Sequence, residues 1–276
     1  MLLPCITLTT DFGLRDHYVA AMKGVIYRLA PGAAIADITH AIPPQDIPEA
    51  AYTLAQAHAW FPAGTIHVVV VDPGVGTARR ALLATAGGHF FVAPDNGVLS
   101  PALERAAGPV EVRHCTADRF WLPQPSSTFH GRDIFAPMAA WLARGAAAAE
   151  FGPPIDDYLR LELPRPRREG SRVFGAILHQ DGFGNLITNL TPRDLDWTLA
   201  APRRWRGQAG RAPIRELRGC YAGAPAGSVF AIWGSSGWLE LSSSGQSAAE
   251  LTGLVRGEEL QFELCPGGGG AAGGTG

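Results

Sequence analysis

Short hydrophobic runs alternate with longer amphipathic stretches through residues 1–160 of the chain. We expect strands at residues 6–10, 33–38 and 66–71, and helices at residues 17–29 and 46–60, where apolar residues recur at helical spacing. The run at 66–71 reads IHVVVV, a continuous pattern typical of a strand covered on both faces. The alternation predicts an α/β domain with a mostly parallel, Rossmann-like sheet and flanking helices.

The pattern changes after a stretch of prolines and arginines, LPRPRREG, at residues 163–170. Beyond it the chain has short β-like runs separated by Gly, Asp and Pro, without a long helical pattern. We expect strands at residues 173–179, 186–189, 228–233 and 238–242. This texture predicts a smaller β-barrel domain.

Four segments therefore make up the predicted organisation. Residues 1–162 form the α/β domain, residues 163–170 a solvated linker, and residues 171–265 the β-barrel domain. The tail at residues 266–276 reads PGGGGAAGGTG after Cys265 and is expected to be disordered, because it offers nothing to pack.

The composition narrows the classes of partner. Its 23 basic and 25 acidic residues nearly cancel, which argues against nucleic acid or an anionic membrane as the main partner. The sequence has neither a signal-peptide pattern nor a run of about 20 apolar residues, so we expect a cytoplasmic protein. The cysteines lack metal-ligand spacing and are expected to be reduced thiols: Cys5, Cys115, Cys220 and Cys265.

The sharpest local motif is VVVVDPGVGTARR, in which Asp72 follows the apolar strand. Ligands of open parallel sheets bind beyond the carboxyl ends of strands, which makes Asp72 a candidate site residue. Gly74 and Gly76 have the spacing of a dinucleotide loop, but Arg79 replaces its third glycine, so that fingerprint fails. The alternative is a turn in which Asp72 caps a following helix.

The first expected strand ends in a similar way, at Asp11, with Asp16 and Tyr18 just beyond. Two carboxylates beside a strand end suit sugar hydroxyls and an ammonium group. Capping of the next helix by Asp16 is an equal interpretation.

His130 lies in the motif STFHGRDIFAP. Pro137 fits only the first turn of a helix, which we expect to begin near Arg132 or Asp133. A helix N-terminus disfavours the imidazolium form, so His130 is expected to be neutral and able to accept a proton. A purely structural histidine is the alternative.

The fourth motif, DGFGNLITN, lies in the second domain. Phe183 offers an aromatic face and Asn185 an amide, and together they suit a purine. Without such a ligand the motif is only a glycine-rich hairpin.

Taken in order, six motifs spread over residues 6–265 resemble those of the S-adenosyl-L-methionine (SAM) hydrolases, also called SAM hydroxide adenosyltransferases. They are TDFGLRDHYVAAMKG, ITHAIPPQDI, FPAGTIHVVVVDPGVGTARR, VAPDNGVLS, TFHGRDIFAP and DGFGNLITN. This family is related to enzymes that attack the same carbon with fluoride or chloride. The resemblance implies an α/β domain, a β-barrel domain, and a homotrimer with its sites between subunits.

The resemblance also implies a set of three residues that activates water: Asp72, Arg79 and His130. Arg79 is chosen over Arg80 because it stands seven residues after Asp72, as in the family motif. Asp11 is expected to hold the ribose hydroxyls and Asp16 the methionine ammonium.

Further substrate contacts are implied on both sides of the predicted linker. Phe183 and Asn185 are expected to bind adenine, and Tyr18 and Asp181 to contribute to the substrate site. The family often has Gly-Asn-Ala-Ala near its C-terminus, where this chain has Gly-Gln-Ser-Ala-Ala at residues 245–249. Three residues of the GSSGWLE motif are candidates for the methionine end: Ser235, Ser236 and Glu240.

The chemistry that the resemblance implies needs no cofactor. The sulfonium is already a good leaving group, and no zinc ligand set is present to lower the pKa of water. Arg79 can stabilise developing hydroxide, and His130 is the better proton acceptor. A SAM-dependent halogenase and a non-enzymatic protein that binds SAM or adenosine are the alternatives.

Overall fold

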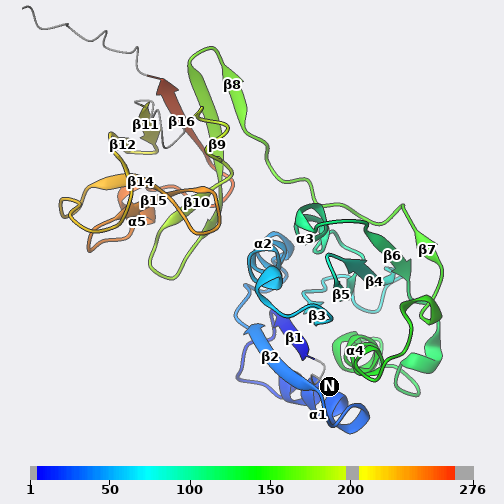
Figure 1. The fold of residues 1–276 in the computed structure, drawn as a ribbon. Helices are drawn as coiled ribbons and strands as arrows, with labels where there is room; N and C mark the ends of the chain where they lie inside the picture. The colour runs from blue at the N-terminus through cyan, green and yellow to red at the C-terminus, as the bar shows by residue number, and fades with distance from the viewer. Residues whose placement is uncertain (1–4, 197–204, 265–276) are drawn as a thin grey trace, which may run out of the picture. The chain divides into compact units, whose positions relative to one another are not determined.

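The computed structural model describes residues 5–196 and 205–264 and divides into two compact units, Met1–Glu162 and Leu163–Gly276 (Figure 1). The expected disordered tail at 266–276 and Cys265 lie outside the described residues.

The first unit is built around a seven-stranded sheet with the order β2-β1-β3-β5-β4-β6-β7. Its strands are β1 (Cys5–Thr10), β2 (Ala34–Thr39), β3 (Ile66–Val70), β4 (Ala81–Ala86), β5 (His89–Pro94), β6 (Glu111–His114) and β7 (Pro154–Ile155). The strands expected at 6–10, 33–38 and 66–71 are thereby confirmed as β1, β2 and β3.

The sheet is mixed, so the prediction of a mostly parallel sheet is wrong for its second half. The pairings β1–β2, β1–β3 and β3–β5 are parallel, whereas β4–β5, β4–β6 and β6–β7 are antiparallel. For β4 and β5 the cause lies in Gly87 and Gly88, which join these strands with φ values of 57° and 81°. A two-residue turn of this kind can only link antiparallel neighbours.

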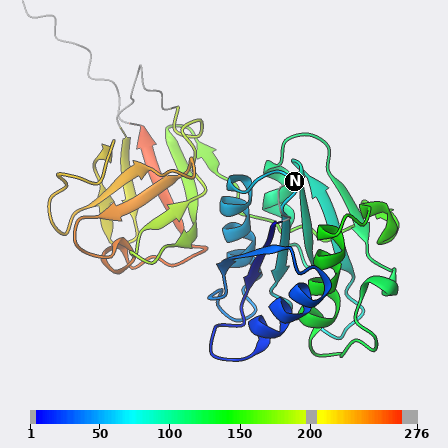
Figure 2. The same cartoon turned by 60° about the horizontal axis from the view of Figure 1, so that its bottom comes forward.

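Helices cover both faces of this sheet. The α-helices of the first unit are α1 (Tyr18–Leu29), α2 (Ile47–Ala57), α3 (Ser100–Arg105) and α4 (Ala136–Ala143). The α1 and α4 helices contact each other, as the blue and green helices in Figure 2 show, and α2 contacts α3. Short turns of other helix types are η1 (His58–Trp60), η2 (Asp118–Phe120), η3 (Gly131–Phe135) and η4 (Ala148–Glu150).

Strand β3 is buried on both faces, as its sequence predicts. Val68 and Val70 belong to one core cluster, together with Met22 of α1. Val69 belongs to the opposite cluster, together with Leu54 of α2. This double burial fixes the end of β3, from which Asp72 follows, in the middle of the sheet.

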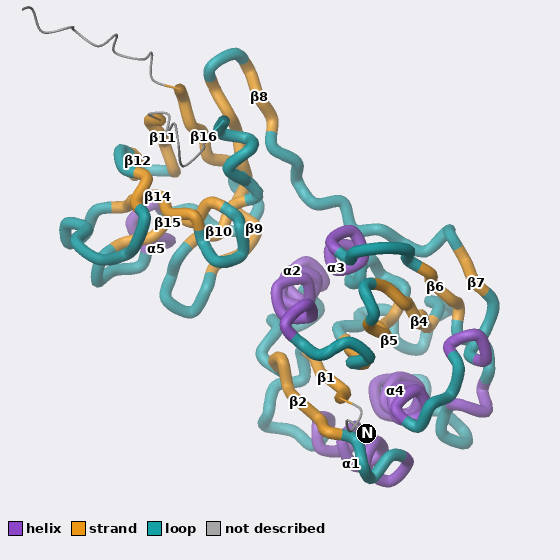
Figure 3. Tube along the Cα trace, viewed as in Figure 1, coloured by secondary structure: helices purple, strands orange, loops and turns teal. Residues whose placement is uncertain are grey.

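The second unit consists mostly of strands and loops with one short helix, α5 (Ala248–Thr252), among its described residues (Figure 3). Its strands are β8 (Arg167–Glu169), β9 (Arg172–Gln180), β10 (Leu186–Thr188), β11 (Trp205–Ala209), β12 (Ala212–Ile214), β13 (Leu217–Arg218), β14 (Val229–Trp233), β15 (Leu239–Ser243) and β16 (Glu259–Leu264). The four expected strands of this part are confirmed as β9, β10, β14 and β15.

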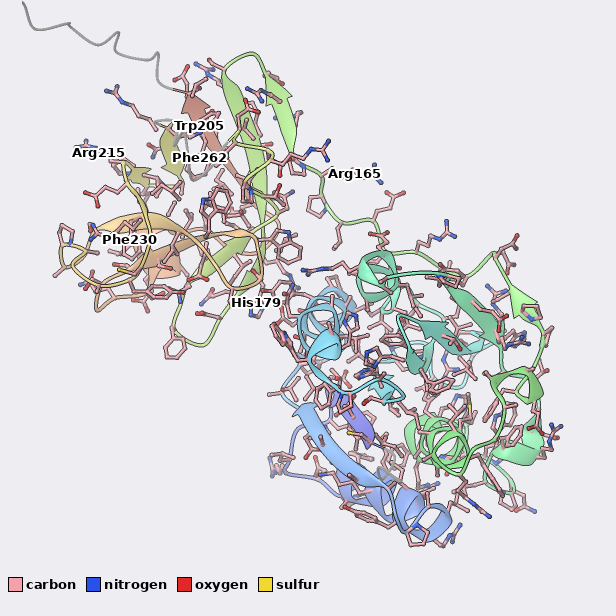
Figure 4. All side chains as sticks on the ribbon, viewed as in Figure 1. Arg165, His179, Trp205, Arg215, Phe230 and Phe262 are labelled. Atoms are coloured by element: carbon pink, nitrogen blue, oxygen red, sulfur yellow. The ribbon has the colours of Figure 1, made fainter. Side chains whose placement is uncertain are left out.

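These strands form one curled sheet with the path β12-β11-β16-β9-β10-β15-β14-β13, from which β8 branches by pairing with β9. The path is not closed by hydrogen bonds among the described strands, so the predicted barrel is observed as a half-barrel. Strand β8 lies within the segment expected to be a linker, because Gly170 has a φ of 59° and turns the chain back into β9. Inside the curl lie Phe262, labelled in Figure 4, and Leu241, with Trp205 packed against them.

No helix in the described parts of the chain is long and apolar enough to cross a membrane.

Candidate active site

Asp72 and Asp11 lie at the same edge of the first sheet. Strands β1 and β3 are parallel neighbours, with Thr10 opposite Val70. Asp11 directly follows Thr10, and Asp72 comes two residues after Val70. The two carboxylates predicted from separate motifs are therefore brought to adjacent strand ends.

The loop between β3 and β4 folds back so that Arg79 contacts Asp72. The guanidinium Nε donates to both carboxylate oxygens at 2.9 Å, and Nη2 forms a further short bond to Oδ2. Both side chains are largely buried, which strengthens a charged pair relative to one in water. A strand, β4, follows this loop, so the alternative in which Asp72 caps a helix is wrong.

Arg79 also reaches His130, because its Nη2 lies 2.6 Å from His130 Nδ1. Asp72, Arg79 and His130 thus form one continuous hydrogen-bonded chain. Arginine can only donate, so Nδ1 is the acceptor and a neutral His130 carries its proton on Nε2. The guanidinium additionally lies over the Phe135 ring, 5.1 Å from its centroid.

Burial lowers the pKa of His130 below its ordinary value, and the Arg79 cation lowers it further. The carboxylates of Asp72 and Asp133 oppose this shift. The prediction that His130 is held neutral is thus supported, with burial and Arg79 as the main causes.

His130 occupies the N-cap position of the π-helical turn η3, which runs directly into α4 with Pro137 in its first turn. The helical segment thus begins at Gly131, slightly earlier than expected from Pro137. Single π turns within helices occur frequently at functional sites.

The segment before His130 is held by Asp133. Its buried carboxylate accepts from the backbone N–H of Ser126 at 2.8 Å and pairs with Arg132 at 2.6 Å. Asp133 was not a predicted site residue. The signal in the sequence was its place three residues after His130, where a side chain can reach back over the start of a helix.

Asp11 is fixed by a backbone contact, since its Oδ2 accepts from the N–H of Gln45 at 2.8 Å. Tyr18 packs in an aromatic cluster with Phe12 and Phe129, the neighbour of His130. Asp16 is exposed, and α1 has His17 rather than Asp16 at its N-cap, so the capping interpretation of Asp16 is wrong.

In the second unit, Asp181 and Asn185 organise the hairpin between β9 and β10. Asp181 Oδ1 accepts from the backbone N–H groups of Phe183 and Asn185, both at 2.9 Å. Its Oδ2 accepts from the Asn185 amide at 2.8 Å. Asp181, predicted to bind substrate, therefore positions its neighbours, while the Phe183 side chain remains 86% exposed.

The segment where the chain departs from the family pattern supports this hairpin. Ser247 is the N-cap of α5, and its side chain accepts from the N–H of Glu250. Gly184 has a φ of 83°, and a Cβ at this position would lie 2.2 Å from Ser247 Oγ. The sequence at 245–249 thus forms a helix start that packs on the hairpin.

Glu240 lies in β15 opposite Ile187 of β10, on the strand next to this hairpin. Its Oε1 accepts from the hydroxyls of Tyr221 at 2.8 Å and Ser242 at 2.7 Å. Burial and the bond to Glu240 raise the pKa of Tyr221 to about 12. Tyr221 was not predicted, because a lone tyrosine in a Gly- and Ala-rich stretch carries no local signal.

Ser235 and Ser236 lie in the turn between β14 and β15, which closes by a bond from the N–H of Gly234 to the carbonyl of Trp238. Gly234 lies against Glu240, since a Cβ there would be 3.0 Å from Oε2. The three candidates for the methionine end thus share one corner of the second unit.

Within residues 5–196 and 205–264, no group of three or more His, Cys, Asp or Glu side chains is arranged to hold a metal ion.

Comparisons with known proteins identify the family of both units. The model of the SAM hydroxide adenosyltransferase N-terminal domain matches residues 6–152, and that of the C-terminal domain matches residues 175–261. A protein of Salinispora arenicola named (R)-S-adenosyl-L-methionine hydrolase is 40% identical over 94% of this chain and 97% of its own length. A fluorinase of Actinoplanes is 30% identical over 70% of this chain and 74% of its own.

The crystal structure of an uncharacterized conserved protein from Thermotoga maritima is also similar. It has a TM-score of 0.85 and 35% sequence identity, and the match covers 93% of this chain and 99% of that one. On the evidence of both domain models and of relatives aligned over nearly the whole chain, this protein belongs to the SAM hydroxide adenosyltransferase family.

Proposed function

We propose that the protein hydrolyses SAM at the ribose C5′ carbon to give adenosine and L-methionine. The observation that carries this proposal is the chain Asp72–Arg79–His130 at the end of β3. The hydrolase names of relatives at 40% identity support the same reaction.

The reaction requires an aligned water and a proton acceptor. Methionine leaves as a neutral thioether, so the C–S bond breaks without a proton donor. Water has a pKa of about 15.7, and attack at neutral pH therefore needs a base at the moment of bond formation. Arg79 cannot be that base, because it stays protonated.

The contact between Arg79 and His130 suggests where the water acts. A water that inserts between them accepts from Arg79 Nη2 and donates to His130 Nδ1. The proton then moves to Nδ1 while the water oxygen forms the new bond to C5′. Arg79 stabilises the developing negative charge, and Asp72 fixes the guanidinium in the required orientation.

Substrate binding is assigned to residues of both units. Asp11 holds the ribose hydroxyls, Asp16 receives the methionine ammonium, and Tyr18 lines the same region. Phe183 stacks on adenine. Asn185, whose amide donor is engaged by Asp181, offers its carbonyl oxygen to the exocyclic amine.

The assembly and setting form part of the same proposal. The enzyme is a homotrimer with sites between subunits, acts without a metal ion or other cofactor, and works in the cytoplasm. Activity should survive exhaustive chelation, and a loss that zinc or magnesium restores would contradict metal independence.

One assay tests the reaction itself. Purified protein is incubated with SAM, with and without chloride or fluoride, and the products are separated by chromatography. Adenosine as the product in both conditions supports hydrolysis. A 5′-halo-nucleoside would identify a halogenase, and unchanged SAM would identify a binding protein.

A further inference from the structure

The turn that follows β5 contacts both ends of the loop that carries Asp72 and Arg79. Asn96 Nδ2 donates to the carbonyl of Val71, directly before Asp72, at 2.8 Å. The backbone N–H of Asp95 donates to the carbonyl of Arg80, directly after Arg79, at 3.0 Å. Two consecutive residues thus bind the first and last peptide groups of the loop.

A second contact fixes the direction of Arg80. Its Nε donates to Asp95 Oδ2 at 2.7 Å, and its two terminal nitrogens donate to the carboxylate and carbonyl of Asp157 at 2.7 and 2.8 Å. Arg79 and Arg80 lie directly before β4. Arg80 is anchored on Asp95 and Asp157, while the adjacent Arg79 pairs with Asp72.

The turn at residues 95–97 is itself fixed by contacts with neighbouring segments. Asp95 is only 4% exposed, and its Oδ1 accepts from the N–H of Leu159 at 2.8 Å. Asn96 Oδ1 accepts from the N–H of Val98 at 3.2 Å. Gly97 has a φ of 89°, and a Cβ there would lie 2.9 Å from the N of Leu161. The Asn96 amide is thereby preorganised to meet Val71.

We propose that Asn96 and Asp95 are positioning residues that hold Asp72 and Arg79 in register with His130. This inference rests on the proposed function, since it assigns them to the water-activating set. Displacements of about 1 Å in such a set can reduce turnover on the order of 10²-fold.

Asn96→Ser is designed to remove one of the two hydrogen bonds of the Asn96 side chain and to keep the other. A serine hydroxyl can still accept from an N–H two residues ahead, whereas it is too short to reach the carbonyl of Val71. Asp95→Asn is the second variant, because it keeps an acceptor for Leu159 and removes the charge that pairs with Arg80. Asn189→Ser is the matched control, since Asn189 likewise joins two backbone groups, those of Ala176 and Pro164.

The readout independent of turnover is the NMR titration of His130 in the full chain without substrate, assigned with His130→Ala. His130 is faced by Arg79 and Asp72 from the loop and by Asp133 from its own π turn. If the loop loosens, the Arg79 cation lies less often beside the imidazole. The pKa of His130 then rises toward its ordinary value, because the charge of Arg79 lowers it.

We expect this rise in Asn96→Ser and Asp95→Asn but not in Asn189→Ser. We also expect kcat to fall by about 10-fold or more with little change in KM. A lower melting temperature with an unchanged His130 titration and unchanged kcat in both variants would overturn the proposal. If the wild type formed no adenosine from SAM, the proposed function would be refuted. The two failures are distinguishable, because the titration of His130 is measured without substrate.

Discussion

Arg79 Nη2 donates to His130 Nδ1 at 2.6 Å, which assigns the proton of a neutral His130 to Nε2. The nitrogen that can receive a proton from water is therefore the one that Arg79 already binds. In the proposed reaction water shares that contact, so we expect both residues to be needed to activate it.

Removing either partner should affect turnover rather than binding. We expect Arg79→Ala and His130→Ala each to lower kcat by at least about 10²-fold, the scale of a positioned acid–base group, with little change in SAM affinity. The double variant should lose much less than the sum of the two effects, since both act on one water. Single-turnover kinetics beside calorimetric binding measure this. Arg119→Ala, which removes an exposed arginine paired with Glu150, is the control. Near-normal turnover in His130→Ala would exclude it from the reaction.

The pH profile should report a histidine whose pKa is lowered. In the proposed mechanism activity requires neutral His130. Burial and Arg79 both lower its pKa, so we expect activity to fall as pH drops through that lowered value. We expect the acid limb of kcat/KM below about 6.5, the ordinary pKa of histidine. In Arg79→Ala the residual activity should show this limb at higher pH. An acid limb at the same pH in Arg79→Ala and in the wild type would show that the limb does not arise from His130.

A cluster of three histidines, His58, His67 and His89, should make the folded protein less stable in acid. His67 is fully buried, with Nδ1 2.8 Å from Thr7 Oγ1 and Nε2 3.4 Å from His89 Nδ1, and His58 packs beside both. Burial, followed by the charges of His89 and His58, lowers the pKa of His67 to about 3.

Because the unfolded chain binds a proton near pH 6.5 and the folded chain does not, this stabilisation is complete above that pH. It is lost as pH falls toward 3, by about 1.4 kcal/mol per pH unit for one proton. Urea unfolding between pH 8 and pH 4 measures how the free energy of unfolding changes with pH. We expect this pH dependence to be smaller in His67→Phe and unchanged in His17→Gln, whose side chain is exposed. Equal slopes in all three proteins would contradict the assignment.

Gly76 should be required for the contact between the loop that carries Asp72 and Arg79 and the segment that precedes His130. It has a φ of 77°, and a Cβ there would lie 2.3 Å from the carbonyl oxygen of Ser127. Gly76→Ala should therefore lower the melting temperature and kcat together. Gly108→Ala is the matched control, because Gly108 has a similar φ of 83° but no described atom within 4 Å of an added Cβ. If the two variants behaved alike, backbone strain rather than the clash would be responsible.

Glu240 and Tyr221 should distinguish the methionine end of the substrate from adenosine. We expect Glu240→Gln and Tyr221→Phe to weaken SAM binding and leave adenosine binding nearly unchanged, because Glu240 is a candidate for the methionine end and Tyr221 donates to its carboxylate. Calorimetry with each ligand measures the difference. Ser242→Ala removes the other hydroxyl on the same carboxylate oxygen and should have a smaller effect. Equal weakening for both ligands would place Glu240 elsewhere in the site.

The sequence predicted the part of the candidate site that depends on local pattern. The all-apolar run of β3, the position of Asp72 after it and the seven-residue step to Arg79 are all visible in one motif. The antiparallel half of the sheet was missed because no strands were predicted from β4 to β7, although Gly87 and Gly88 mark a turn.

Contacts between distant segments carried no such signal. Tyr221 meets Glu240 across 19 positions, and Asn96 meets Val71 across 25, so neither pair has a recognisable spacing. The strands β11 and β12 were missed because short segments such as WRGQA and API alternate too little to be recognised. These features depend on the assembled sheet rather than on propensity.

The π turn at Gly131–Phe135 has an evolutionary consequence. Such a turn accommodates one residue more than the α-helix it interrupts. Deleting one residue there restores the regular helical repeat, in which each position is rotated by about 100° from the next. We expect His130 then to be rotated away from Arg79 relative to α4. We therefore expect the loss of a single codon at this turn to remove the proposed base from the site.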